Sequence, residues 1–337
     1  MLRARPVRGA VQRTVGTAHH HPHGTADTPE PSEGTVITRV IPGTTSGFVA
    51  RPAMIYLPPQ YFQPRFARTR FPVVELLHGT PGSPSNWVVH LNVVHLADQL
   101  VSKHLMGPMV LVMPTMSPRR DCQECVDAPG ALDDTCITDD VRADLLARYR
   151  VSSDPAEWGI AGYSSGGYCS ANLALRHPAD FGAAGVMDGY FRPQDGPAAA
   201  ALHFNQAAEA ARDPLLLASA LHRDASPLPA FWVSVGTGDA ADLNGALAFG
   251  AALHGVEEVP LYREPGAVHN FYAWQPAAPR LLAWMWPLLA PPQLRVDFPI
   301  AGRIENGTIT GGTGHSRAPR TSQVVAERHV KRRRGRA

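Results

Sequence analysis

The 337-residue chain has no uninterrupted apolar run near the roughly 20 residues that a membrane-spanning helix needs, so no transmembrane segment is expected. It carries little net charge, and the formal value of +2 gives no indication of nucleic-acid binding in the body of the chain. The N-terminal residues also lack the apolar segment of a secretory signal. That absence favours a cytoplasmic location, with association with the cell envelope as the alternative.

Both ends of the chain lack apolar periodicity. Residues 1–34 are rich in Arg, His and Pro, and the chain from residue 301 onward changes from Gly- and Thr-rich sequence to the basic end KRRRGRA. Such a composition cannot bury enough apolar surface to offset the entropy of ordering. We therefore expect disordered tails over residues 1–34 and 301–337, with one domain over residues 35–300 between them. The basic end is interpreted as a solvated tail rather than a nucleic-acid site.

Cysteine is scarce, with four in the chain. Cys122 and Cys125 form a C-x-x-C pair and Cys136 follows, but no further Cys or His lies near enough in sequence to complete a zinc site. The sequence therefore predicts no bound metal. A Cys125–Cys136 disulfide is the expected pairing if the protein is exported, and Cys169 is expected to be a buried thiol.

Between the tails, short β-rich runs alternate with helical stretches. This alternation is typical of a mostly parallel sheet with helices on both faces, and it predicts a single α/β domain. In such sheets the functional residues lie beyond the carboxyl ends of the strands. The expected strands cover residues 35–41, 53–58, 72–78, 108–114, 157–162, 181–187, 230–236 and 259–264, and the expected helices lie near residues 88–102, 139–150, 166–177, 212–222, 243–254 and 278–289.

The stretch GIAGYSSGGY at residues 159–168 contains the pattern G-x-S-x-G. In proteins with this pattern a sharp turn between a strand and a helix exposes a serine nucleophile, and the glycines allow the close packing of the turn. Here the pattern follows an expected strand and opens an expected helix, so Ser164 is the candidate nucleophile. The backbone N–H of Ser165, at the start of that helix, is the candidate donor to an oxyanion.

A serine hydroxyl needs a histidine base, and the histidine needs a carboxylate that fixes its tautomer. Only His254 and His269 lie after the strand expected at residues 230–236 and before the C-terminal tail. His254 ends an expected helix ahead of Gly255, which capping explains. His269 lies in the loop after the last expected strand and is the candidate base.

Three aspartates are candidates for the acid. Asp239 directly follows the strand expected at residues 230–236 and is the preferred candidate. Asp242 lies one helical turn later and is interpreted as a cap of the next helix. Asp188 lies at the end of the preceding strand. Asp188 and Asp242 remain alternatives to Asp239.

A second oxyanion donor is expected from the loop after the strand at residues 72–78. This loop reads GTPGSPSNW, in which Gly79 and Thr80 have backbone N–H groups and Pro81 has none. Thr80 is the preferred donor. Thr80 and Ser165 therefore form the candidate oxyanion hole.

Five segments of the chain together resemble the Putative esterase family of α/β-hydrolases, which includes esterase D (S-formylglutathione hydrolase), enterochelin-type esterases and actinobacterial mycolyltransferases. The segments are SGFVARPAMIYLPPQYF, PVVELLHGTPGSPSNW, GYSSGGYCSANLALRHP, VGTGDAADL and PGAVHNFYAW, and the resemblance spans about residues 35–290. It implies the α/β-hydrolase fold and no metal or organic cofactor. The site residues that it implies are the triad Ser164, Asp239 and His269, with an oxyanion hole at Thr80 and Ser165.

The residues and the resemblance together predict a serine hydrolase that cleaves carboxylic esters, of small-molecule or lipid-like substrates, through an acyl-enzyme on Ser164. Two alternatives are an acyltransferase of the mycolyltransferase type, which moves the acyl group to a sugar alcohol, and a non-catalytic scaffold. Mycolyltransferases usually use glutamate as the acid, and none lies near residue 239. The aromatic candidates for a substrate pocket, or alternatively for core packing, are Trp87, Tyr163, Tyr190, Phe191, Phe271, Tyr272 and Trp274.

Overall fold

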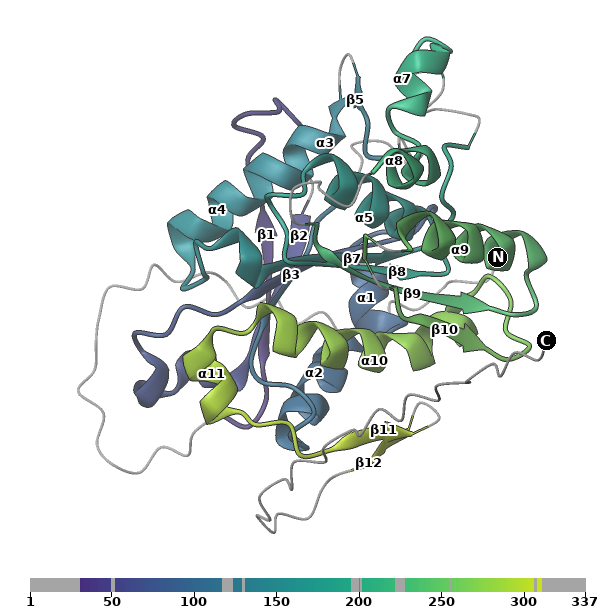
Figure 1. Ribbon diagram of the computed structural model, residues 1–337. Coiled ribbons are helices and arrows are strands. Elements are labelled where there is room, and N and C mark those ends of the chain that lie inside the picture. Colours follow the sequence, from purple (N-terminus) through teal and green to yellow (C-terminus); the bar gives the residue numbers. More distant parts are fainter. Residues whose placement is uncertain are drawn as a thin grey trace, which may run out of the picture. The chain divides into compact units, whose positions relative to one another are not determined.

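An eight-stranded sheet forms the centre of the fold, with the strands in the order β1-β2-β4-β3-β7-β8-β9-β10 (Figure 1). All the residues that are described belong to one unit, residues 31–337. The computed structural model describes residues 31–49, 52–116, 124–128, 131–194, 200, 202–221, 228–254, 256–257, 259–305 and 308–310.

The sheet begins with antiparallel strands and continues as a parallel sheet. β1 (Thr35–Val40) pairs antiparallel with β2 (Pro52–Leu57), which pairs antiparallel with β4 (Val110–Met113). Every residue of the inner strands β3, β4, β7 and β8 is buried, because helices cover both faces. This architecture confirms the expected mostly parallel sheet. The strands joined by parallel pairing to β4 and to one another are β3 (Val73–Leu77), β7 (Trp158–Tyr163), β8 (Ala183–Met187), β9 (Ala230–Gly236) and β10 (Leu261–Glu264).

Helices cover the two faces of the sheet (Figure 1). One face carries α1 (Ser85–Val89), α2 (Val93–Ser102) and α10 (Phe271–Leu289), and the opposite face carries α4 (Val141–Arg148), α5 (Ser165–Arg176) and α9 (Ala240–Leu253). Within the described ranges, none of the helices combines the length and the apolarity that spanning a bilayer requires. The shorter elements are α3 (Asp133–Thr135), α7 (Gln206–Ala210), α8 (Pro214–Ala220), α11 (Pro292–Asp297), the 3-10 turns η1 (Pro59–Phe62), η2 (Pro64–Phe66) and η4 (Pro155–Glu157), the π-helical η3 (Cys136–Asp140), and the strands β5 (Asp127–Ala128) and β6 (Ala131–Leu132).

The parallel register brings the carboxyl ends of neighbouring strands to one edge of the sheet. The last residue of β7, Tyr163, pairs with Met187 at the end of β8, and Met187 pairs with Ser234 of β9. The ladder continues one step beyond the strands, since Ser164 donates its backbone N–H to the carbonyl of Met187 at 3.1 Å and Asp188 donates to Ser234 at 2.7 Å. The loops that follow β7, β8 and β9 therefore start side by side.

The chain beyond residue 300 corrects one expectation. Two short strands, β11 (Arg303–Glu305) and β12 (Thr308–Thr310), pair antiparallel, and the backbone N–H of Ala301 donates to the carbonyl of His104 at 2.9 Å. The expected disordered tail is thus wrong for residues 301–305 and 308–310, where the β-branched residues Ile304, Thr308, Ile309 and Thr310 favour strand pairing. Residues 1–30 and 311–337, which hold most of both expected tails, lie outside the described residues.

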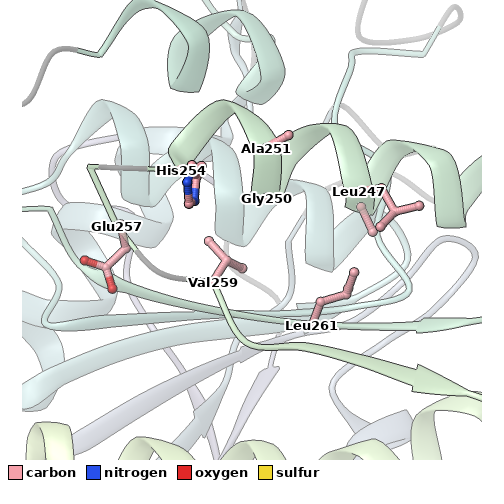
Figure 2. Close-up of a pocket in the computed structure, with 8 residues that line it drawn as sticks. Leu247, Gly250, Ala251, His254, Glu257, Val259 and Leu261 are labelled. Atoms are coloured by element: carbon pink, nitrogen blue, oxygen red, sulfur yellow. The ribbon is translucent and has the colours of Figure 1, made fainter. Parts of the chain in front are cut away.

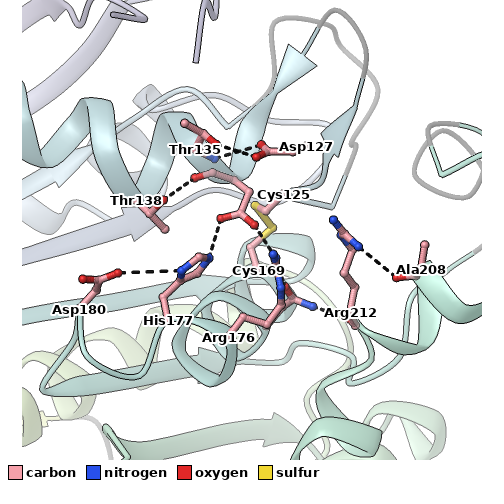
Figure 3. A network of polar contacts seen from close by, with 12 residues as sticks. Cys125, Asp127, Thr135, Thr138, Cys169, Arg176, His177, Asp180, Ala208 and Arg212 are labelled. Atoms are coloured by element: carbon pink, nitrogen blue, oxygen red, sulfur yellow. Dashed lines mark hydrogen bonds and ion pairs between the residues drawn. A yellow bond between two sulfur atoms is a disulfide. The ribbon is translucent and has the colours of Figure 1, made fainter. Parts of the chain in front are cut away.

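Residues 124–128 and 131–140 are fastened to α5, and Figure 3 shows contacts of this kind. Cys125 forms a disulfide with Cys169 of α5, not with Cys136, so the expected pairing is wrong. Cys136, the first residue of η3, is a buried free thiol. Asp134 adds ion pairs to Arg176 at 2.5 Å and to His177 at 2.9 Å. Cys122 lies outside the described residues.

Candidate active site

Ser164 occupies a strained turn between β7 and α5. Its backbone angles, φ 57° and ψ −126°, lie in a region that a side chain other than glycine rarely adopts. A Cβ added at Gly162 would collide with the backbone of Gly166, and one at Gly166 would collide with the carbonyl of Leu77. The glycines therefore allow the helix to pack closely on the strands. The Ser164 hydroxyl makes no capping bond to α5 and remains available for other contacts.

His269 contacts this hydroxyl directly. Its Nε2 lies 2.8 Å from Oγ of Ser164, and it belongs to the loop between β10 and α10. The indole of Trp274, in the first turn of α10, meets the imidazole edge-on with ring centroids 5.4 Å apart. The structure thus brings the sequence-predicted serine and histidine into hydrogen-bond contact.

The carboxylate that contacts His269 is Asp242 rather than Asp239. Oδ2 of Asp242 lies 2.7 Å from Nδ1 of His269. Asp239 instead caps α9, accepting the backbone N–H groups of Ala241 at 3.0 Å and Asp242 at 3.2 Å. The sequence predicts the opposite assignment, with Asp239 as the acid and Asp242 as the helix cap. Asp239 immediately precedes α9 and therefore occupies the N-cap position. Asp242 lies in the first turn of α9, where side chains point back toward the helix N-terminus and so toward His269.

Asp188, the other alternative, lies on a second side of the same imidazole. Its Oδ2 is 3.5 Å from Nδ1 of His269, and its side chain is 1% exposed, against 15% for Asp242. Oδ1 accepts the backbone N–H of Gly236 at 3.0 Å, and Oδ2 accepts the indole N–H of Trp274 at 3.3 Å. Asp188 and Asp242 therefore both lie beside the imidazole of His269, at the carboxyl edge of the sheet.

These carboxylates determine the electrostatics of the histidine. The hydrogen bond that His269 donates to Asp242 is the main cause that raises the pKa of His269. The charges of Asp188, Asp242 and Asp239 raise it further, against the opposing effect of burial. Burial raises the pKa of Asp188 itself. The site is therefore arranged to stabilise a protonated imidazole, which is what a general base becomes when it takes a proton.

The two expected oxyanion residues lie next to each other. The hydroxyl of Ser165 donates to Oγ1 of Thr80 at 3.0 Å, and a Cβ placed on Gly79 would lie 3.0 Å from Cβ of Ser164. Ser165 opens α5, so its backbone N–H is among the unpaired donors of a helix N-terminus. The loop after β3 and the start of α5 thus border Ser164 on one side.

The sequence analysis did not single out His78, which holds this loop. His78 is buried, its Nδ1 lies 2.8 Å from the carbonyl of Gly79, and its Nε2 accepts the backbone N–H of Met116 at 3.4 Å. Because Nε2 is an acceptor, Nδ1–H is the donor to Gly79. Burial lowers the pKa of His78, which keeps the ring neutral in this role. A histidine directly before the Gly-rich loop was the available signal.

Three of the seven aromatic candidates, Trp87, Tyr163 and Trp274, are packed in the core beside the site, while Tyr190 stacks on Tyr168 and Phe191 on Phe249. Tyr163 stacks on Trp274 with centroids 4.4 Å apart and contacts Trp87, and all three rings are buried. Phe271 is half-buried, and Tyr272 is 82% exposed. These last two follow His269 closely in sequence and are accessible to solvent.

Two other features of the described residues were considered as binding sites. Asp188, Asp242 and His269 are the one group of three potential metal ligands there, and their donor atoms are already engaged with each other, Ser164, Gly236 and Trp274. A cavity of about 390 Å³ lies between α9 and the edge strand β10, as Figure 2 shows, and none of its lining residues belongs to the site around Ser164. Its lining residues are Ala246, Leu247, Gly250, Ala251, His254, Glu257, Val259 and Leu261.

A mostly parallel sheet, a strained serine directly after β7, an aspartate from the first turn of α9 and a histidine from the loop after β10 define the α/β-hydrolase class. Residues 50–285 match the model of the family described as "Putative esterase". The chain belongs to this family. The family match confirms the resemblance.

Solved structures share the fold at low sequence identity. A ferulic acid esterase superimposes with a TM-score of 0.64 and 19% identity, over 77% of this chain and 99% of that one. An S-formylglutathione hydrolase from Agrobacterium tumefaciens gives 0.64 and 20%, over 78% and 98%. FphF, a fluorophosphonate-binding serine hydrolase of Staphylococcus aureus, gives 0.62 and 19%, over 75% and 98%.

A curated relative is more similar in sequence but longer. An uncharacterised protein of Corynebacterium glutamicum is 31% identical over 183 residues, which are 52% of this chain and 42% of that protein. The chain therefore matches less than half the length of this relative.

Proposed function

We propose that the chain hydrolyses carboxylic esters through an acyl-enzyme on Ser164. The observation that carries the proposal is a continuous pair of hydrogen bonds, in which the Ser164 hydroxyl donates to Nε2 of His269 (2.8 Å) and Nδ1–H of His269 donates to Asp242 (2.7 Å). This order of acid, base and nucleophile is what activates a serine hydroxyl at neutral pH. The intact arrangement also argues against the non-catalytic scaffold.

In the first half-reaction, Nε2 of His269 takes the proton of the Ser164 hydroxyl while Oγ attacks the ester carbonyl carbon. Asp242 accepts the Nδ1–H of the imidazolium that forms. The negative charge on the former carbonyl oxygen is stabilised by backbone N–H groups, for which Ser165 and Thr80 are the proposed donors. The alcohol leaves with the proton from His269.

The second half-reaction repeats these steps with water as the nucleophile. His269 takes a proton from water, the hydroxide oxygen attacks the acyl carbon, and Ser164 leaves with the proton that returns from Nε2. If an alcohol takes the place of water, the same residues transfer the acyl group. Partition between the two is a property of the acceptor, and adding a sugar alcohol to the assay measures it directly.

The proposed substrates are small-molecule esters. Similar folds among the solved structures carry the names ferulic acid esterase and S-formylglutathione hydrolase. The side chain of His269 is 33% exposed and Tyr272 is 82% exposed, so the reacting atoms lie near solvent rather than at the bottom of a deep tunnel. An open site of this kind is suited to substrates that present the ester at one end.

We also propose that the protein works in an oxidising compartment. Cys125 and Cys169 are joined in a disulfide, and such bonds persist outside the reducing cytosol. The proposal replaces the expectation of a cytoplasmic location, which rested on a missing signal segment. Mass mapping of the protein isolated from its source under thiol-blocking conditions tests it. A blocked, unpaired Cys125 would contradict it.

The decisive test of the activity combines turnover with covalent labelling. Wild type, Ser164→Ala and the matched control Ser219→Ala, which changes an exposed serine of α8, would be assayed on p-nitrophenyl esters from acetate to laurate. A fluorophosphonate probe would be added in parallel, because it reports an activated serine without a matching substrate. We expect turnover and labelling in wild type and Ser219→Ala and neither in Ser164→Ala. Labelling that survives Ser164→Ala would refute the assignment.

A further inference from the structure

We infer that two carboxylates act on His269. Asp242 accepts the hydrogen bond from Nδ1–H directly, and the buried Asp188 positions the imidazole and accepts that hydrogen bond when Asp242 is removed. The inference rests on the proposed function, because it concerns the base of that reaction. It goes further in stating that the two acid positions, after β8 and after β9, are both occupied and act together.

The position of Asp188 is fixed from three directions. Its backbone N–H donates to Ser234 at 2.7 Å, its Oδ1 accepts from Gly236 at 3.0 Å, and its Oδ2 accepts from Trp274 at 3.3 Å. The backbone φ of 51° is a left-handed conformation that aspartate tolerates better than most residues. A side chain held in this way cannot move away from the imidazole without breaking several contacts.

Distance makes Asp188 an alternative acceptor. Oδ2 of Asp188 is 3.5 Å from Nδ1 of His269, and Oδ2 of Asp242 is 2.7 Å from the same atom, a difference of 0.8 Å. A small tilt of the imidazole would bring Nδ1–H within hydrogen-bond distance of Asp188. Such a tilt keeps the proton on Nδ1, so that Nε2 stays free to accept the proton of Ser164.

Trp274 connects Asp188 to the orientation of the base. The indole N–H is bonded to Asp188, one side of the ring stacks on Tyr163 at 4.4 Å, and its edge contact with His269 has centroids 5.4 Å apart. The carboxylate thereby holds the ring against which the imidazole rests. Asp188 thus contacts His269 in two ways, directly at Nδ1 and through the indole of Trp274.

The charges around His269 act in one direction. Asp188 from the loop after β8, and Asp239 and Asp242 from the start of α9, all raise the pKa of His269. Of the two carboxylates near Nδ1 of His269, Asp188 is less exposed than Asp242. Water screens a buried charge less than an exposed one. The neighbouring groups from α10 and β7, Trp274 and Tyr163, are neutral at the pH of the reaction, since burial raises the pKa of Tyr163.

A double-mutant cycle tests the inference. Asp188→Asn would be combined with Asp242→Ala, and Asp154→Asn would be the matched control, because Asp154 caps η4 at the opposite end of β7 from Ser164. We expect Asp188→Asn to lower kcat about 10-fold in the wild-type background and about 100-fold in the Asp242→Ala background, since residues that act as a unit are not additive. An equal factor in both backgrounds would overturn the inference.

A titration that needs no turnover separates this inference from the proposed function. NMR of histidine-labelled protein follows the pKa of His269, with its signal assigned by its loss in His269→Gln. Asp188→Asn is expected to lower that pKa and Asp154→Asn to leave it unchanged. An unchanged pKa in Asp188→Asn overturns the inference even if esters are cleaved, whereas a lowered pKa supports it even if no tested ester is a substrate.

Trp274→Phe distinguishes charge from positioning. It keeps the stacked ring and the Asp188 charge but removes the N–H donor. We expect kcat to fall with KM nearly constant and the pKa of His269 to stay raised. A pKa lowered as far as in Asp188→Asn would show that the indole, not the carboxylate, is responsible, and an unchanged kcat would overturn the positioning role.

Discussion

Two aspartate–histidine pairs in this protein have nearly the same local geometry. Asp242 lies 2.7 Å from Nδ1 of His269, and Asp134 lies 2.9 Å from Nε2 of His177. In both pairs the hydrogen bond to the carboxylate is the main cause that raises the pKa of the histidine. The pairs differ in what the second ring nitrogen faces. For His269 it is the hydroxyl of Ser164, and for His177 it is the carboxylate of Asp180 at 4.0 Å.

Because the two pairs differ in what the second ring nitrogen faces, an aspartate–histidine pair is not catalytic by itself. Asp134 also pairs with Arg176, and both of its contacts fasten the segment beside the disulfide onto α5 (Figure 3). A histidine whose two nitrogens both face acids can stabilise structure but has no nucleophile to activate. The strained turn that delivers Ser164 to His269 is what turns the first pair into a candidate active site.

The largest expected effect comes from removing each histidine in turn. His269→Ala should lower kcat at least about 10⁴-fold, because the base is lost. His177→Ala should leave kcat within about 2-fold and lower the free energy of unfolding by about 1–3 kcal/mol, because the buried Asp134 loses a hydrogen-bond partner. Ester turnover and urea unfolding measure the two effects. A comparable loss of kcat in both variants would break the comparison.

Glu75 is a buried carboxylate without a histidine partner in the part of the chain that the structure describes, and its pKa can be compared with that of Asp134. Glu75 of β3 is completely buried, and neither of its oxygens has a hydrogen-bond partner among the described residues. Burial raises its pKa from 4.5 to about 8, whereas the partners of Asp134 lower the pKa of that carboxyl. Burial alone thus has the opposite effect from burial with partners.

Glu75→Gln should therefore stabilise the protein at high pH. The folded state keeps the Glu75 proton between pH 4.5 and about 8 while the unfolded state releases it, so the free energy of unfolding of wild type falls over this range. The fall is at most roughly 5 kcal/mol at 1.36 kcal/mol per pKa unit. Urea unfolding at pH 5 and 9 measures it. The exposed Glu33→Gln is the control, and a pH-independent difference between Glu75→Gln and wild type would contradict the expectation.

The disulfide is expected to contribute next. Cys125 and Cys169 are 44 residues apart, and closing a loop of that length stabilises by about 2–4 kcal/mol. The double variant Cys125→Ser/Cys169→Ser should show this loss in urea unfolding, and dithiothreitol should then have no further effect. Cys136→Ala, at the free buried thiol, is the control that should retain sensitivity to dithiothreitol. Unchanged stability of the double variant would show that the ion pairs of Asp134 suffice.

Most of the fold was predictable because its strands are buried on both faces. Such strands appear in the sequence as short apolar runs, and the runs expected at residues 72–78 and 230–236 correspond to β3 and β9. The hairpin of β11 and β12 was not predicted, because three-residue strands with Gly around them have no recognisable period. The pairing of Cys125 with Cys169 was also not predictable, since it depends on how a loop folds back over α5.

The candidate site was predictable where a motif fixes the backbone. The glycines around Ser164 determine its turn, and the position of His269 after the last large strand follows from the order of the elements. The choice between Asp239 and Asp242 depended on which of two neighbouring side chains caps α9. The pattern D-A-A-D is compatible with either role, and only the direction in which the helix starts decides between them.

The smallest expected effect concerns pH and the His177 pair. The pKa of His177 is raised, so its contribution to stability is fully present below pH 6.5 and is lost as pH rises through the folded-state value. The wild-type advantage over His177→Gln in urea unfolding should therefore shrink from pH 5.5 to 8.5, by at most about 1 kcal/mol, because solvent screens a side chain that is 31% exposed. The exposed His254→Gln should show no such change.

For His269 the same kind of pKa shift should appear in kinetics instead, because only the neutral ring accepts the Ser164 proton. The value of kcat/KM should rise with pH through a midpoint above 6.5. A wild-type advantage that grew with pH, or a kinetic midpoint below 6.5, would mean that the two histidines do not share the electrostatics on which the comparison rests.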